Sequence, residues 1–205
     1  DLRLTPDRCP GHRPPAYNRA VRVLSGASGA ARAVQGRSAL TVLLLFGLLC
    51  ALFSWQLWTP AEGDRRMIGA ADGDLVRQFY PYRVFVARAW ATGHPPVWNP
   101  HQYGGTPAWA DPQQAVLYPW RALQAPFGIG GGRLPLWAVE LEAVAHLMLG
   151  GWFVALLVRR LSARWTAAAG AGAVFAFGGY LSGYPVEQLA IVDTAIWIAP
   201  CLVGV

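Results

Sequence analysis

Residues 38–58 read SALTVLLLFGLLCALFSWQLW, a stretch without a single charged side chain. It is about as long as the ~20 apolar residues that a helix needs to cross the hydrocarbon core of a bilayer. Trp55 and Trp58 stand at its far end, where aromatic side chains prefer the membrane interface. A signal peptide is the alternative, but the preceding basic region is too long and no small-x-small cleavage site follows. The stretch therefore predicts a transmembrane helix.

Three further hydrophobic segments follow, at residues 134–158, 165–184 and 189–205. The segment 165–184 is rich in Ala and Gly, which permits close packing of helices. The segment 189–205 runs to the end of the sequence, so we expect an N-terminal fragment whose partners include the remaining transmembrane helices of a longer protein. Together with residues 38–58, these segments predict an all-α integral membrane protein with several spans.

The composition points to the same class of protein. The sequence is 54% hydrophobic and only 14% charged, whereas typical soluble domains have about 25% charged residues. All 17 basic residues are arginine, and the formal net charge is +6. A basic tail can indicate nucleic-acid binding, but beside a span it more often sets orientation. We therefore expect membrane lipids as partners and no nucleic acid.

The arginines predict the orientation in the membrane. Seven precede residue 38 and three lie between 158 and 165, and short basic segments stay in the cytoplasm. Residues 1–37, which lack hydrophobic periodicity, are then a disordered basic cytoplasmic tail. The loop 59–133 faces outward, because the rule weakens for loops beyond ~60 residues. The expected location is a membrane, with a cytoplasmic N-terminus.

The segment 134–158 carries acids that need an explanation. Glu140, Glu142 and His146 lie in its first half. Charged residues inside a span usually face a cavity or a polar partner. Near the end of a span they can instead reach the interface. The sequence leaves both interpretations open.

The loop 59–133 is too polar for a span and too long for a simple connection, since most connections have ~4–6 residues. Within it, residues 81–93 predict a short helix, because Pro suits a first turn and Gly an exit. Apolar residues gather on one face of that helix, with Arg83 and Arg88 away from it. This pattern is typical of a helix that lies in the membrane interface.

Acids open the loop and are candidates for its chemistry. Asp72 and Asp74 form a D-x-D, which in extended backbone directs both carboxylates to one side; Glu62 and Asp64 lie just before it. The pair could ligate a divalent cation, or one member could act as a general base. The competing interpretation of Asp74 is a helix N-cap.

Arginines in the loop suggest an anionic partner. Arg77, Arg83 and Arg88 could bind the phosphate of a lipid-linked substrate, because guanidinium suits bidentate phosphate contacts. Arginines spaced along an interfacial helix can instead meet anionic lipid headgroups. The aromatic residues Trp98, Trp109 and Tyr103 could anchor the loop at the interface.

An ordered series of short motifs runs through the loop. D-L-x-x-Q-x-Y-P begins at Asp74, G-x-x-P-x-W-N-P at Gly93, Y-G-G-T-P at Tyr103, D-P-Q at Asp111 and L-Y-P at Leu117. This order and spacing resembles the YfhO-like family of bacterial multi-spanning membrane proteins, which are related to the type C (GT-C) glycosyltransferases. The resemblance runs from about residue 72 to 200, and His146 and the series Gln188, Trp197 and Pro200 fit its weaker second half.

The resemblance implies a GT-C-like fold and transfer of a sugar from a polyprenyl-phosphate donor to a cell-envelope acceptor at the outer face. It implies Asp74, and with it Asp72, as the catalytic base or metal-linked acid, and it leaves the need for a divalent cation open. It also implies that Trp98, Trp109 and Tyr103 stack on the sugar, and that the protein lies in the inner membrane of a bacterial cell. The alternative is a non-catalytic transporter or envelope-assembly subunit. The candidate substrate-binding residues are Arg77, Gln78, Tyr80, Arg83, Trp98, Asn99, Tyr103, Gly104, Gly105, Asp111, Gln113 and Tyr118.

Overall fold

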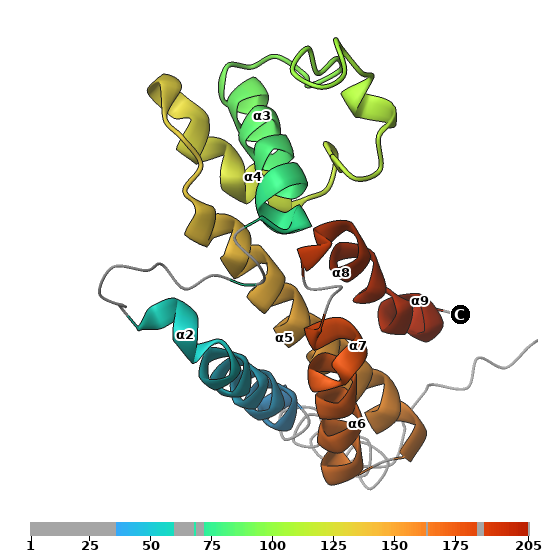
Figure 1. Ribbon diagram of the computed structural model, residues 1–205. Helices are drawn as coiled ribbons and strands as arrows, with labels where there is room; N and C mark the ends of the chain where they lie inside the picture. The colour runs from blue at the N-terminus through green and yellow to red at the C-terminus, as the bar shows by residue number, and fades with distance from the viewer. Residues whose placement is uncertain (1–35, 60–67, 69–71, 163, 184–186, 205) are drawn as a thin grey trace, which may run out of the picture. The chain divides into compact units, whose positions relative to one another are not determined.

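The computed structural model describes residues 36–59, 68, 72–162, 164–183 and 187–204. Most of the expected tail at 1–37 therefore lies outside the described residues, as do Glu62 and Asp64. The chain divides into two compact units, Asp1–Leu40 and Thr41–Val205, and the contacts reported below lie within the second. The secondary structure of the described part is helical, with no strand (Figure 1), which confirms the predicted all-α class for these residues.

Two helices in the described part are long and apolar enough to cross a membrane: Gly36–Phe53 and α5, Leu136–Ser162. The first covers most of the predicted span 38–58, and the short helix α2, Trp55–Trp58, follows it after Ser54. The second has 27 residues and is therefore about 40 Å long at 1.5 Å per residue. It starts close to the predicted residue 134 but extends beyond residue 158.

The predicted single helix at 165–184 is wrong, because the structure divides it. Helix α6, Trp165–Phe177, ends where Gly178 turns to extended backbone, and α7, Gly179–Ser182, forms a separate turn. Consecutive glycines explain the break, since Gly is a poor helix former. The last segment is likewise divided into α8, Leu189–Ala195, and α9, Ile198–Gly204.

Helices α5 and α6 pack closely along the second half of α5. A Cβ atom at Gly172 would lie 2.3 Å from the carbonyl oxygen of Gly151, so the two backbones meet at this pair. The Phe46 ring, fully buried, fills the space beside both glycines. The close packing predicted from the small residues of 165–184 is therefore confirmed for α6.

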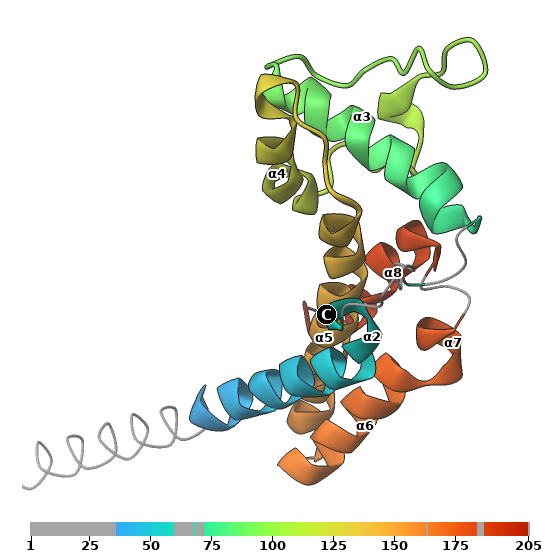
Figure 2. The ribbon, with the colours of Figure 1, turned by 60° about the vertical axis from the view of Figure 1, so that its left-hand side comes forward.

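The loop that follows α2 folds into short helices at the N-terminal end of α5. They are the π-helix η1, Leu75–Phe79; α3, Tyr80–Ala91; the 3-10 turn η2, Ala108–Ala110; α4, Trp120–Gln124; and η3, Ala125–Gly131. Figure 2 shows α3 and α4 side by side beyond this end of α5. Helix α3 is the helix predicted at 81–93.

Helix α3 packs inside the loop fold. A Cβ atom at Gly128 of η3 would lie 2.6 Å from the Ala87 carbonyl oxygen, so only glycine allows this approach. Val86 and Ala87 are buried, but so is Arg83, while Arg88 is exposed. The prediction that Arg83 points away from the packed face is therefore wrong.

Candidate functional site

A cavity of about 1000 Å³ extends along the exposed face of α3, and we call it the α3 groove. Its wall comes from η1, from α3, from the segment after α3 and from Arg133, which precedes α5. Most of its aspartate, arginine and histidine side chains are basic, which favours an anionic ligand. They are Asp74, Arg77, Arg88, His94, His101 and Arg133.

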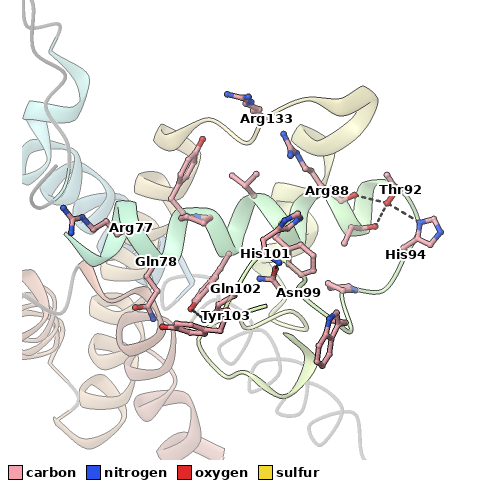
Figure 3. A pocket seen from close by; sticks show the side chains of 18 of the residues that line it. Arg77, Gln78, Arg88, Thr92, His94, Asn99, His101, Gln102, Tyr103 and Arg133 are labelled. Carbon is pink, nitrogen blue, oxygen red and sulfur yellow. Dashed lines mark hydrogen bonds between the residues drawn. The ribbon is translucent and has the colours of Figure 1, made fainter. Parts of the chain in front are cut away.

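Figure 3 shows how the arginines and histidines are distributed around α3. Arg88 extends from the helix on the side where Arg133 lies on a separate segment, and Arg77 lies at the start of the helix. His94 lies beyond its end, where the Nδ1 atom is 3.4 Å from the Thr92 hydroxyl. The groove thus presents arginines at the start of α3 and along it, and a histidine beyond its end.

Polar and aromatic side chains form the other side of the groove. Tyr103 is 92% exposed and Trp98 is 56% exposed. Both therefore offer free ring surface, and aromatic rings of this kind stack on planar or apolar ligand faces. The Tyr82 hydroxyl accepts a hydrogen bond from Gln102 Nε2 at 2.6 Å. Burial raises the pKa of Tyr82 above its usual range.

Two glycines of the motif series shape the turn beside Trp98. Gly104 and Gly105 have φ values of +79° and +125°, a region that other residues rarely adopt. A Cβ atom at Gly105 would lie 2.6 Å from the Trp98 ring. These glycines therefore support the groove through backbone geometry and room for Trp98.

Asp74 lines the groove, and its carboxylate oxygen Oδ2 accepts a hydrogen bond of 3.0 Å from Gln188 Nε2. Asp74 stands at the N-cap position of η1, but its side chain makes no capping hydrogen bond there. The N-cap interpretation of this residue is therefore not supported. A carboxylate in a basic groove can accept a proton or bind a hydroxyl.

Asp72 has a different environment. Its Oδ2 atom lies 3.5 Å from Arg77 Nη2, and both side chains are more than 70% exposed. Exposed pairs of this kind contribute about 0–1 kcal/mol. Within the described residues, no group of three or more His, Cys, Asp or Glu side chains could hold a metal ion. The cation site that was one alternative for the D-x-D is therefore not formed by the described residues alone.

A second polar constellation is buried where α3, α4, α5 and α8 meet. We call it the ion-pair cluster; its members are Arg83, Arg121, Glu142, His146 and Asp193. All five are at least 96% buried. Two arginines face two carboxylates, so the formal charges of these four balance.

Glu142 is the centre of the ion-pair cluster. Arg121 forms a bidentate ion pair with its carboxylate: Nη1 donates to Oε2 at 3.0 Å and Nη2 donates to Oε1. Gln124 Nε2 donates to Oε2 at 2.7 Å, and Arg83 Nη2 to Oε1 at 3.3 Å. Of the two interpretations for Glu142, a polar partner inside the protein is therefore the correct one.

Arg83 connects the groove helix to the rest of the loop. Its Nη1 atom donates to the backbone carbonyls of Gln113 and Gln114, each at 3.1 Å, and its Nη2 atom donates to Asp193 at 3.1 Å. Burial lowers the pKa of Arg83, while Glu142 raises it. Arg83 therefore fixes the rotation of α3 from inside, rather than lining the groove.

His146 extends the cluster through hydrogen bonds. Its Nδ1 atom lies 2.6 Å from the Glu142 carbonyl oxygen, and because a carbonyl only accepts, Nδ1 carries a proton. In the neutral ring, Nε2 then accepts from the Tyr118 hydroxyl at 2.7 Å. Trp197 Nε1 donates to the same hydroxyl at 3.1 Å. Burial raises the pKa of Tyr118.

The predicted site residues are thus divided between three environments. The α3 groove contains Asp74, Arg77, Gln78, Tyr80, Trp98, Asn99 and Tyr103. Arg83 and Tyr118 belong to the buried cluster or contact it. The remaining residues are structural or lie outside both: Asp72, Gly104, Gly105, Asp111, which caps the turn at Gln113 N, and Gln113, which bonds Gln78.

Several functional candidates were not predicted. His94, His101 and Arg133 line the groove but stand outside the apolar or motif patterns. Asp193 was missed although its signal was present, because a lone acid inside an apolar segment usually has a polar partner. No family model, curated protein or solved structure matches the chain, so its function is inferred from these residues.

Proposed function

We propose that this protein is a multi-pass membrane glycosyltransferase of the type C kind, which transfers a sugar from a polyprenyl-phosphate donor to a cell-envelope acceptor. The observation that carries the proposal is the composition of the α3 groove. One carboxylate, three arginines, two histidines and exposed aromatic rings line the same cavity. Arginine suits phosphate, aromatic rings suit sugars, and a carboxylate suits the activation of a hydroxyl.

In the proposed reaction, Asp74 takes the proton from an acceptor hydroxyl. The acceptor oxygen then forms a bond to the anomeric carbon, while the bond from that carbon to the phosphate oxygen breaks. The electron pair leaves with the lipid phosphate, whose charge Arg77, Arg88 or Arg133 stabilises. Trp98 and Tyr103 stack on the sugar.

This mechanism requires the loop to face outward from the inner membrane of a bacterial cell. Arginines lie before the first apolar helix and at the end of α5. They favour a cytoplasmic position for the start of the first helix and for the C-terminal end of α5. In a variant with Cys9, Cys50 and Cys201 replaced by Ser, a cysteine at Gly36 should react only from the cytoplasmic side. A cysteine at Val97, which is 55% exposed, should react only from outside. Reaction of both from one side would contradict the orientation.

The proposed activity has a direct assay. Membranes that contain the intact protein should move a radiolabelled hexose from polyprenyl phosphate into an envelope fraction faster than membranes without it. A hexose on polyprenol without the phosphate should not be used, because the groove arginines then lack an anion to bind. Equal transfer from both donors, or none from either, would contradict the proposal.

A non-catalytic membrane protein is the second candidate. It is favoured by one observation: within the part of the chain that the structure describes, acids and arginines converge in the ion-pair cluster, which is buried and does not line the groove. In that case the cluster simply fastens the loop to α5 and α8, and the groove binds a ligand without reaction. The same transfer assay separates the two candidates.

A further inference from the structure

Asp74 is held by a residue from the far end of the described chain. Gln188 precedes α8, 114 residues after Asp74, and its Nε2 atom donates to Asp74 Oδ2 at 3.0 Å. Only a donor suits a charged carboxylate oxygen, so the amide nitrogen of Gln188 has to face Asp74. This contact engages one of the two carboxylate oxygens from outside η1.

The orientation of Asp74 is not set by its own helix. Its side chain makes no capping hydrogen bond to η1, although residues at this position commonly do. A general base must reach the proton it takes at about 2.6–3.2 Å, and small displacements in such geometry cost up to ~100-fold in rate. An outside contact that selects one rotamer therefore has direct consequences for the reaction.

Helix α8 is a firm support for this contact. Asp193, on the same helix, receives hydrogen bonds from Arg83 at 3.1 Å and from Arg121 at 3.2 Å, both buried. Trp197, just after α8, donates to Tyr118. Precise sites are those whose side chains are held by rigid elements. Gln188 stands at the start of a helix that meets this requirement.

We propose that Gln188 is a positioning residue: its amide holds one oxygen of Asp74 so that the carboxylate is presented to a hydroxyl bound in the α3 groove. This inference rests on the proposed function. It gives the residue at the start of α8 a part in the site, although this residue lies outside the motif series of the loop. Gln188 itself does not line the groove and needs no contact with the substrate.

The test is a double-mutant cycle between Gln188 and Asp74 in the intact protein, with a polyprenyl-phosphate hexose as donor. Gln188→Met keeps the length of the side chain and removes the donor, so kcat should fall about 10- to 100-fold while KM for the donor stays within about twofold. In the Asp74→Ala background the same substitution should change the residual rate less than about twofold, because its target is gone.

Two further variants complete the design. Gln188→Glu places a carboxylate against a carboxylate and should reduce kcat more than Gln188→Met does. Thr194→Ala is the matched control on α8, since among the described residues the Thr194 hydroxyl donates to the Ala190 carbonyl of its own helix, and the rate of this variant should equal that of the wild type. All variants are compared at equal monodispersity in detergent.

The possible results test the role of Gln188 separately from the proposed sugar transfer. If Gln188→Met lowers the rate equally with and without Asp74, Gln188 has only a structural role and the inference is overturned. An unchanged kcat in Gln188→Met also overturns it, while the proposed function stands. If Asp74→Ala alone keeps the wild-type rate, both the proposed function and the inference fall.

Discussion

Replacing Glu142 with Gln should destabilise the fold by about 3–5 kcal/mol, because it removes one of the two carboxylates that face the buried arginines and leaves them only Asp193. Glu142 accepts from Arg83, Arg121 and Gln124 in a site with no exposed side-chain surface. The amide keeps the volume of the carboxylate, so packing should change little and the effect should report on charge. The measurement is thermal unfolding of the purified protein in detergent.

Two matched variants show whether the loss of a buried charge causes this destabilisation. Asp72→Asn makes the same chemical change in an exposed pair and should cost no more than about 1 kcal/mol. In the double variant Glu142→Gln with Arg121→Gln, one positive and one negative charge disappear together. This variant should be less destabilised than the sum of the two single changes. A Glu142→Gln protein as stable as Asp72→Asn would show that the cluster does not hold the loop.

The elements with a local signal were predicted well from the sequence. The uncharged run at 38–58 and the apolar segment at 134–158 correspond to the two helices that could span a membrane. The Pro and Gly at the ends of 81–93 mark α3, and Gly93 has the positive φ, +73°, expected just past a helix end. Each of these features depends on neighbours in the sequence, so the pattern was sufficient.

The ion-pair cluster has no such local signal. Arg83 is separated from Glu142 by 59 residues and from Asp193 by 110. A pattern that places hydrophobic residues inside and arginines outside assigns Arg83 to the surface, and only its distant partners reverse this. The helix 165–184 failed for a different reason: hydropathy does not register the break that Gly178 introduces.

The sequence predicted several residues of the candidate site but not their arrangement around α3. Asp74, Arg77, Trp98 and Tyr103 share the α3 groove, although they come from different motifs of the series. The sequence did not indicate that α3 presents one face to this groove and the opposite one to the ion-pair cluster. That division separates residues that line the groove from residues that hold the helix.

The most direct test of the central claim is the transfer rate of Asp74→Asn. Asn keeps an acceptor oxygen for Gln188, so the variant should fold and bind donor as the wild type does. It cannot take a proton, and a general base typically contributes ~10²–10⁴-fold. Asp72→Asn, whose carboxylate pairs with Arg77 at the surface, should lose much less.

The measurement is transfer of a radiolabelled hexose from polyprenyl phosphate by the intact protein that carries each substitution. We expect a rate for Asp74→Asn at least about 100-fold below the wild-type rate, at unchanged thermal stability and donor binding. A rate for Asp74→Asn close to that of the wild type would remove Asp74 from the reaction, and with it the case that the α3 groove is an active site.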